Sequence, residues 1–137
     1  MTTQYWLVKS EPDTYSWNDL IRDSRTDWTG VRNYAARLHL KAMRSGDHVF
    51  FYESGRTKAV VGIAEITRAA FPDQTADEAG WVAVELKAVK PLPRPVTLTQ
   101  IKAESSLAGI ALLRQSRLSV QPLAATAFAR IVKLSAA

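Results

Sequence analysis

Apolar residues gather in short runs along the chain, several of them alternating with polar or small residues, and polar turn residues separate the runs. Alternation with a period of two, together with Val, Ile and aromatic residues, is typical of β-strands. Gly62 interrupts one of the runs, which predicts a bulge or a close approach to the backbone there. The pattern therefore predicts strands over residues 5–8, 48–53, 59–66, 81–89 and 118–120.

Helical periodicity is confined to a few short segments with recognisable ends. Ser16, with Asp19 at the capping-box position, predicts a short helix ending near residue 21. Residues 34–43 have helical spacing and several alanines. Thr97 or Thr99 can cap a short helix that carries Ile101. Pro122 predicts the first turn of a last helix, with an apolar stripe formed by Leu123, Ala127, Ile131 and Leu134.

The connections between these elements indicate the fold class. Hairpin-like turns join the strands, among them residues 71–73, and the predicted helices lie outside the strand-rich middle of the chain. This arrangement favours an α+β fold, with a small, mostly antiparallel barrel and peripheral helices, over a parallel doubly wound sheet. The proline-rich residues 90–95 are interpreted as a loop within one fold, so residues 1–137 are expected to form a single domain.

Composition excludes several classes of protein. The 137 residues are 47% hydrophobic and include no cysteine, which removes disulfides, thiol catalysis and cysteine-based zinc sites. No apolar run is long enough to cross a bilayer, and the amino terminus lacks the layout of a secretory signal. We therefore expect a soluble protein of the cytoplasm that does not associate with membranes. We also expect it to be a monomer, although nothing in the composition fixes the oligomeric state.

Charge is distributed unevenly along the chain. The net charge is +5, but residues 1–85 carry 10 basic and 12 acidic side chains, whereas residues 86–137 carry 8 basic side chains and Glu104 alone as an acid. A one-sided basic surface favours a polyanion such as nucleic acid. The alternative is a solubilising face, and charge alone does not decide between the two.

Common catalytic signatures are absent from the sequence. There is no dinucleotide-binding or phosphate-binding glycine loop, no G-x-S-x-G and no H-x-x-x-H. His39 and His48 stand alone, so a structural or surface role is expected for each. A serine nucleophile needs a base, and nothing places either histidine near Ser10, Ser54 or Ser119.

Trp28 is the most distinctive aromatic residue, because it lies in a polar segment beside Gly30. An indole in a loop can stack on a planar base, which is worth about 1–3 kcal/mol for any base. Asn33 can add hydrogen bonds to a base edge, and Arg32 and Arg37 can hold phosphates. The alternative is that Trp28 anchors the loop to the core, and local composition leaves both interpretations open.

Several segments, taken in order, resemble the EVE domain family, which includes the thymocyte nuclear proteins and bacterial counterparts. Each segment is moderately specific, but the ordered set is highly specific and covers nearly the whole chain. The segments are YWLVKSEP at residues 5–12, WTGVRNYAAR at 28–37, FYES at 51–54, VVGIA at 60–64, FPD at 71–73 and SRLSVQPL at 116–123.

The resemblance implies a PUA-like pseudobarrel, a fold shared with YTH and ASCH domains. It also implies a non-catalytic module without cofactor or metal, which reads a modified nucleobase in nucleic acid, foremost a modified cytosine in DNA. Trp28 would then stack on the base; Lys9, Ser10, Asn33 and Ser54 would read its edges; Leu118 and Ser119 would form one wall. The phosphate contacts would come from Arg32, Arg37, Arg114 and Arg117.

One position departs from the family pattern: Glu53 stands where many relatives have His. If this side chain touches the ligand, a carboxylate favours an amino group such as cytosine N4. The favoured interpretation is that Glu53 lies at the rim or faces solvent on an alternating strand.

Two other functions remain as alternatives. A general RNA- or protein-binding module would use the basic carboxy-terminal part and show steep salt dependence without preference for a modification. An ASCH-like hydrolase or nuclease would start from Lys9 and Ser10, but adjacent residues in a strand point to opposite faces, which suits joint chemistry poorly.

Overall fold

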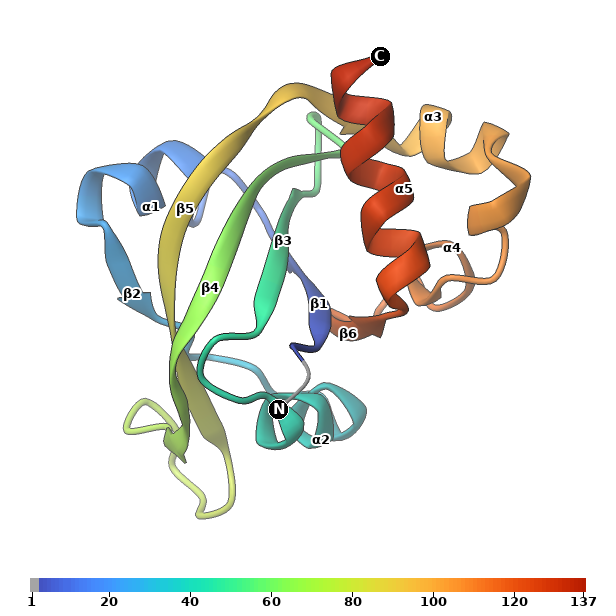
Figure 1. Ribbon diagram of the computed structural model, residues 1–137. Helices are drawn as coiled ribbons and strands as arrows, with labels where there is room; N and C mark the ends of the chain where they lie inside the picture. The colour runs from blue at the N-terminus through green and yellow to red at the C-terminus, as the bar shows by residue number, and fades with distance from the viewer. Residues whose placement is uncertain (1–2) are drawn as a thin grey trace.

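Six strands form one sheet in the computed structural model, which describes residues 3–137 (Figure 1). The strand order is β2-β5-β4-β3-β1-β6, and β1 and β3 are the one parallel pair among the described strands. The prediction of a mostly antiparallel α+β fold is confirmed, although β2 and β6 remain at opposite edges of the sheet and do not close it. The strands are β1 Tyr5–Ser10, β2 Arg25–Asp27, β3 His48–Glu53, β4 Ala59–Pro72, β5 Val82–Thr97 and β6 Val120–Leu123.

Short helices surround the sheet, as predicted. Figure 1 shows α5 lying across one side of the sheet with α3 and α4 next to it, while α1 and α2 lie away from α5. No helix within residues 3–137 is long and apolar enough to cross a membrane. The helices are α1 Trp17–Asp23, α2 Tyr34–Ala42, α3 Leu98–Ala103, α4 Ala111–Arg114 and α5 Ala125–Ala136, with a 3₁₀ turn at Ser105–Leu107.

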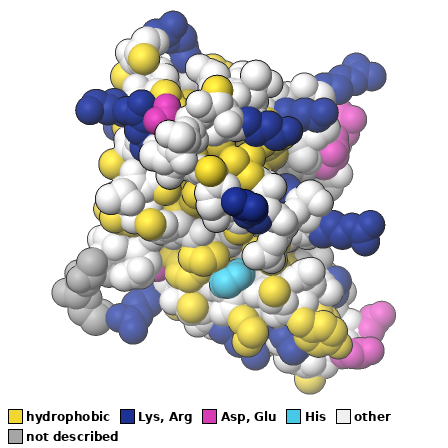
Figure 2. Space-filling model, turned by 90° about the vertical axis from the view of Figure 1, so that its right-hand side faces the viewer, with side chains coloured by type: hydrophobic (Ala, Val, Ile, Leu, Met, Phe, Trp, Pro, Cys, Tyr) yellow, Lys and Arg dark blue, Asp and Glu magenta, His cyan; other side chains and the backbone are white. Residues whose placement is uncertain are grey.

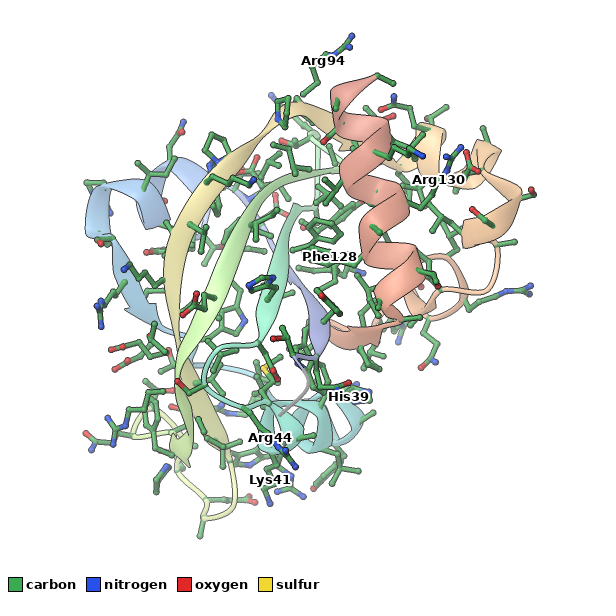
Figure 3. All side chains as sticks on the ribbon, viewed as in Figure 1. His39, Lys41, Arg44, Arg94, Phe128 and Arg130 are labelled. Atoms are coloured by element: carbon green, nitrogen blue, oxygen red, sulfur yellow. The ribbon has the colours of Figure 1, made fainter. Side chains whose placement is uncertain are left out.

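The alternation of side chains in the strands produces two apolar cores, one on each face of the sheet. On the α5 face, Phe128 points from α5 towards the sheet (Figure 3) and stacks on Phe50, with ring centroids 4.0 Å apart. On the other face, Phe51 meets Trp17 of α1 edge-on at 5.6 Å, and α2 covers the same core. The second core lies behind the candidate site described below.

Local signals predicted the starts of α1 and α3 correctly. Ser16 caps α1 in a capping box with Asp19, as predicted, and Thr97 caps α3 in the same way with Gln100. The close approach predicted at Gly62 is also confirmed, because a Cβ built there would lie 2.3 Å from the Trp17 ring. The strand pairing shifts register at the same place.

Several boundary predictions were wrong. The strand predicted over residues 118–120 is β6, which begins at Val120 and ends at Leu123. Strand β4 continues through Phe71 and Pro72, and β5 continues through residues 90–95, which were predicted as a loop. The prolines of that segment occupy alternate positions, so the N–H groups that they lack would all lie on the same side of the strand. Because β2 pairs only with residues 85–87 of β5, the edge of β5 on the β2 side has no partner strand along residues 90–95 in the described part of the chain. Pro122 lies in β6 opposite Trp6, and the last helix begins at Ala125.

Candidate functional site

A cavity of about 670 Å³ opens between strands near the two opposite edges of the sheet. One side is formed by the end of β1 with Ser119, and the other by β2 and residues 28–33. Because β2 and β1 lie far apart in the strand order, the sheet must curl to bring them to the same cavity. The volume is within the range of roughly 300–1,000 Å³ that is typical of small-molecule sites.

Trp28 both anchors its loop and lines this cavity. Its backbone N–H donates to the Val84 carbonyl at 2.7 Å, and its half-buried indole contacts the second core. Tyr15 and Phe51 lie at 6.2 and 5.7 Å from it, each at 82° to its plane. Neither ring stacks in parallel on the indole. The anchoring and the ligand-facing interpretations of Trp28 are therefore compatible.

The buried carboxylate of Asp73, in the connection between β4 and β5, holds the loop that carries Trp28 in place. Asp73 accepts hydrogen bonds from the Gly30 N–H at 2.8 Å and from the Arg32 guanidinium at 3.0 Å, and also from Thr75. Burial would raise the pKa of Asp73, but these hydrogen bonds outweigh it and hold the pKa well below its usual value. Gly30 has a φ of +84°, which favours glycine.

Arg32 and Arg37, both predicted to bind phosphate, are engaged within the protein. Arg32 lines the cavity but is paired with Asp73. Arg37 lies outside it: its guanidinium sits over Tyr34 and Trp81, at 4.9 and 4.6 Å from the ring centroids, and donates to the Gly80 carbonyl. Both arginines thus fasten the turn after β4 to residues 28–37.

The opposite wall contains three of the predicted residues, Lys9, Ser10 and Ser119. The Lys9 ammonium donates to the Ser116 carbonyl at 2.6 Å, and burial lowers its pKa. The Ser10 hydroxyl donates to the Tyr15 carbonyl. Lys9 and Ser10 are therefore each bonded to other groups, and no acid–base pair forms between them.

Asn33 also lines the cavity. The sequence predicted only hydrogen bonds to a base edge for it, whereas the structure shows that it caps a helix. Its side-chain oxygen accepts from the Ala36 N–H at 2.9 Å and so caps α2. No hydrogen bond within residues 3–137 uses its side-chain NH₂ group as a donor, so that group can still donate to a ligand.

The remaining predicted residues lie outside this cavity. Ser54 contacts two residues of the cavity lining, because its hydroxyl donates to the Ser10 carbonyl and to the Glu11 carboxylate, both at 3.3 Å. The others, Leu118, Arg114 and Arg117, line a second and smaller cavity.

Sequence reasoning missed two carboxylates in the first cavity, those of Glu11 and Asp27. Within the described residues, the Asp27 carboxylate has no hydrogen-bond or ion-pair partner. Each is adjacent in sequence to a predicted site residue, Ser10 or Trp28, but adjacency alone does not show which side chains share a cavity. The missed lining residues also include Thr14, Tyr15, Thr26, Thr29, Gly30 and Val31.

Glu53 lies outside the cavity, yet it does not face solvent. It is half-buried, and its carboxylate accepts from the backbone N–H of Trp17 at 2.8 Å, at the first turn of α1. In the part of the chain that the structure describes, no three His, Asp or Glu side chains come close enough together to hold a metal ion.

Comparison with known proteins identifies the family. The EVE domain matches residues 4–134. The chain belongs to the EVE domain family. This EVE protein is 31% identical to mouse thymocyte nuclear protein 1, over 96% of this chain and 74% of the mouse protein.

Several solved structures share its fold. A protein from Rhodopseudomonas palustris, solved by NMR, is 48% identical with a TM-score of 0.93, over 98% of this chain and 94% of that one. Human THYN1 protein, solved in complex with 5-methylcytosine-containing DNA, is 29% identical with a TM-score of 0.91, over 97% and 98% of the two chains. An ASCH protein from Zymomonas mobilis, 14% identical with a TM-score of 0.59 over 96% and 95% of the two chains, shares the fold alone.

Proposed function

We propose that this EVE protein binds DNA that contains a modified cytosine, such as 5-methylcytosine, and holds the modified base in the Trp28 cavity without chemical change. One observation carries the proposal: a base-sized cavity with an indole on its wall lies in a chain whose fold matches a protein solved with 5-methylcytosine-containing DNA. The human complex supports the class of ligand in this proposal, and the size and lining of the cavity support its location.

The groups around the cavity suit the edges of cytosine. The N4 amino group of cytosine donates hydrogen bonds, and carboxylates such as Glu11 and Asp27 accept them. The ring acceptors of the base can take hydrogen bonds from Lys9 or from the Asn33 amide. Val31 and Trp28 offer apolar surface for a methyl group. Flipping the base out of a duplex costs a few kcal/mol, which stacking and these hydrogen bonds would offset.

The test is a titration of duplex DNA, with and without 5-methylcytosine, against wild type, Trp28→Ala and Trp28→Phe. We expect wild type to prefer the modified duplex. Trp28→Ala should weaken that complex by roughly 5- to 150-fold, the range of one base–aromatic stack. Trp28→Phe keeps an aromatic face and should retain most of the affinity, and thermal melting of each variant controls for folding.

Equal affinity of wild type for both duplexes would remove base recognition. If binding were then steeply dependent on salt, and equal for RNA, the general RNA-binding alternative would replace the proposal. Incubation with modified nucleosides and RNA, followed by mass analysis, tests the ASCH-like hydrolase: turnover that is lost in Lys9→Ala would contradict a non-catalytic role.

A further inference from the structure

A second cavity, of about 310 Å³, lies next to the first. It is lined by Asn33 and Ala35 on one side and by residues 114–118 on the other. Asn33 lines both cavities, and Ser119 of the first cavity directly follows Leu118 of the second. The hydrogen bond from Lys9 to the Ser116 carbonyl ties the two walls together. A ligand in one cavity therefore lies beside a ligand in the other.

The two arginines of this second cavity are not neutralised by the protein. Both are exposed. Arg114 donates through Nε to the Ala108 carbonyl at 3.1 Å, which fixes the guanidinium and leaves its terminal NH₂ groups without partners among the described residues. Arg117 has no hydrogen bond or ion pair within residues 3–137. This state contrasts with that of Arg32, which Asp73 holds.

No acidic side chain lines the second cavity, whereas Glu11 and Asp27 line the first. Beyond Glu104 the sequence has no Asp or Glu, and Glu104 is paired with Arg130 at 3.0 Å. The space-filling view of the α3–α5 side likewise shows more Lys and Arg than Asp and Glu (Figure 2). In the first cavity a phosphate would meet the carboxylates of Glu11 and Asp27 as well as Lys9 and the Asp73-paired Arg32, whereas the charged side chains lining the second cavity are both arginines. The second cavity therefore attracts a phosphate more strongly than the first.

We propose that the second cavity is a phosphate subsite, which takes a backbone phosphate next to the nucleotide whose base occupies the Trp28 cavity. The guanidinium groups of Arg114 and Arg117 supply paired N–H donors for its oxygens. The proposal rests on the proposed function and adds to it a path for the DNA backbone, which would run from the Trp28 cavity past Asn33 towards residues 114–118.

The test compares Arg114→Gln and Arg117→Gln with Arg94→Gln as the matched control. Arg94 is also an exposed arginine, and it points into solvent at the end of the molecule away from α2 (Figure 3). Binding of duplexes with and without 5-methylcytosine is measured across a series of salt concentrations. Each cavity variant should lose about tenfold in affinity for both duplexes, and the slope of log affinity against log salt should fall by about one unit. The control should change neither, and Arg117→Lys should recover part of the loss.

The outcomes separate this proposal from the proposed function. Cavity variants that bind like Arg94→Gln, while wild type still prefers the modified duplex, would overturn the phosphate subsite alone. A loss confined to the modified duplex would also overturn it, because the arginine would then read the base. If wild type bound both duplexes equally while the cavity variants still had a reduced salt slope, the result would contradict the base pocket and support the phosphate subsite.

Discussion

Asp73 shows how one side chain can set the shape of a site that it does not line. Its carboxylate is fully buried and holds Gly30 and Arg32, which flank the turn after Trp28. Asp73 lies 43 residues from Gly30 in sequence. Sequence reasoning identified Trp28, whose loop composition is visible locally, but treated Asp73 only as part of a turn. No local pattern shows that a turn in one hairpin will bind a loop from another part of the chain.

Asp73→Asn should lower the free energy of unfolding at pH 7 by about 1–3 kcal/mol, because Arg32 and the bound N–H groups lose a charged acceptor. The folded-state pKa of Asp73 is depressed, so its contribution is present above the unfolded value of about 3.9 and is lost as the pH falls below it. Denaturant unfolding between pH 7 and pH 2 measures this. The variant should be less stable at pH 7 and should lose less stability on acidification; an unchanged acid profile would contradict the role.

At the scale of elements, the meeting of α1 with β4 depends on the absence of a side chain. Gly62 lies against the Trp17 ring, and the strand pairing is irregular beside it. The sequence predicted the close approach from a glycine inside a strand, but not its partner, because Trp17 belongs to a helix on another part of the chain.

Gly62→Ala should destabilise the protein by about 1–3 kcal/mol, since the added methyl group overlaps a buried indole. Gly109→Ala is the matched control, because its added Cβ meets no atom within 4 Å and its φ is not positive. Thermal melting of both variants makes the comparison. Equal melting temperatures would show that the strand shifts to make room, contrary to this prediction.

Glu53 joins two elements as well, since it holds the first turn of α1 from the end of β3. Glu53→Ala should cost about 1 kcal/mol of stability, the typical loss of a helix cap, while the preference for modified DNA stays the same. Glu78→Ala removes an exposed carboxylate as a control. If Glu53→Ala changed the preference without changing stability, Glu53 would contact the ligand instead.

Element boundaries were predicted less well than element types. The strand over residues 48–53 was predicted with its observed ends, because turn residues bound it on both sides. Residues 90–95 were misread, because prolines usually break strands; here they extend β5 beyond its pairing with β2. That error concerned only the length of a strand and left the predicted fold class unaffected.

At the scale of the whole molecule, the fold places two cavities with different charged side chains next to each other. Two carboxylates line the first cavity together with Lys9 and Arg32, whereas the charged side chains that line the second are the arginines Arg114 and Arg117. The basic carboxy-terminal part was visible in the sequence, but its position beside the Trp28 cavity depends on the tertiary fold. The monomeric state and the cytoplasmic location stay predictions.

A crystal structure of the protein with a duplex that contains a single 5-methylcytosine tests the central claim most directly. We expect the modified base to lie outside the double helix, against the Trp28 indole, between the end of β1 and residues 28–33. A modified base that stays stacked in the duplex, with the Trp28 cavity holding no part of the DNA, would contradict it.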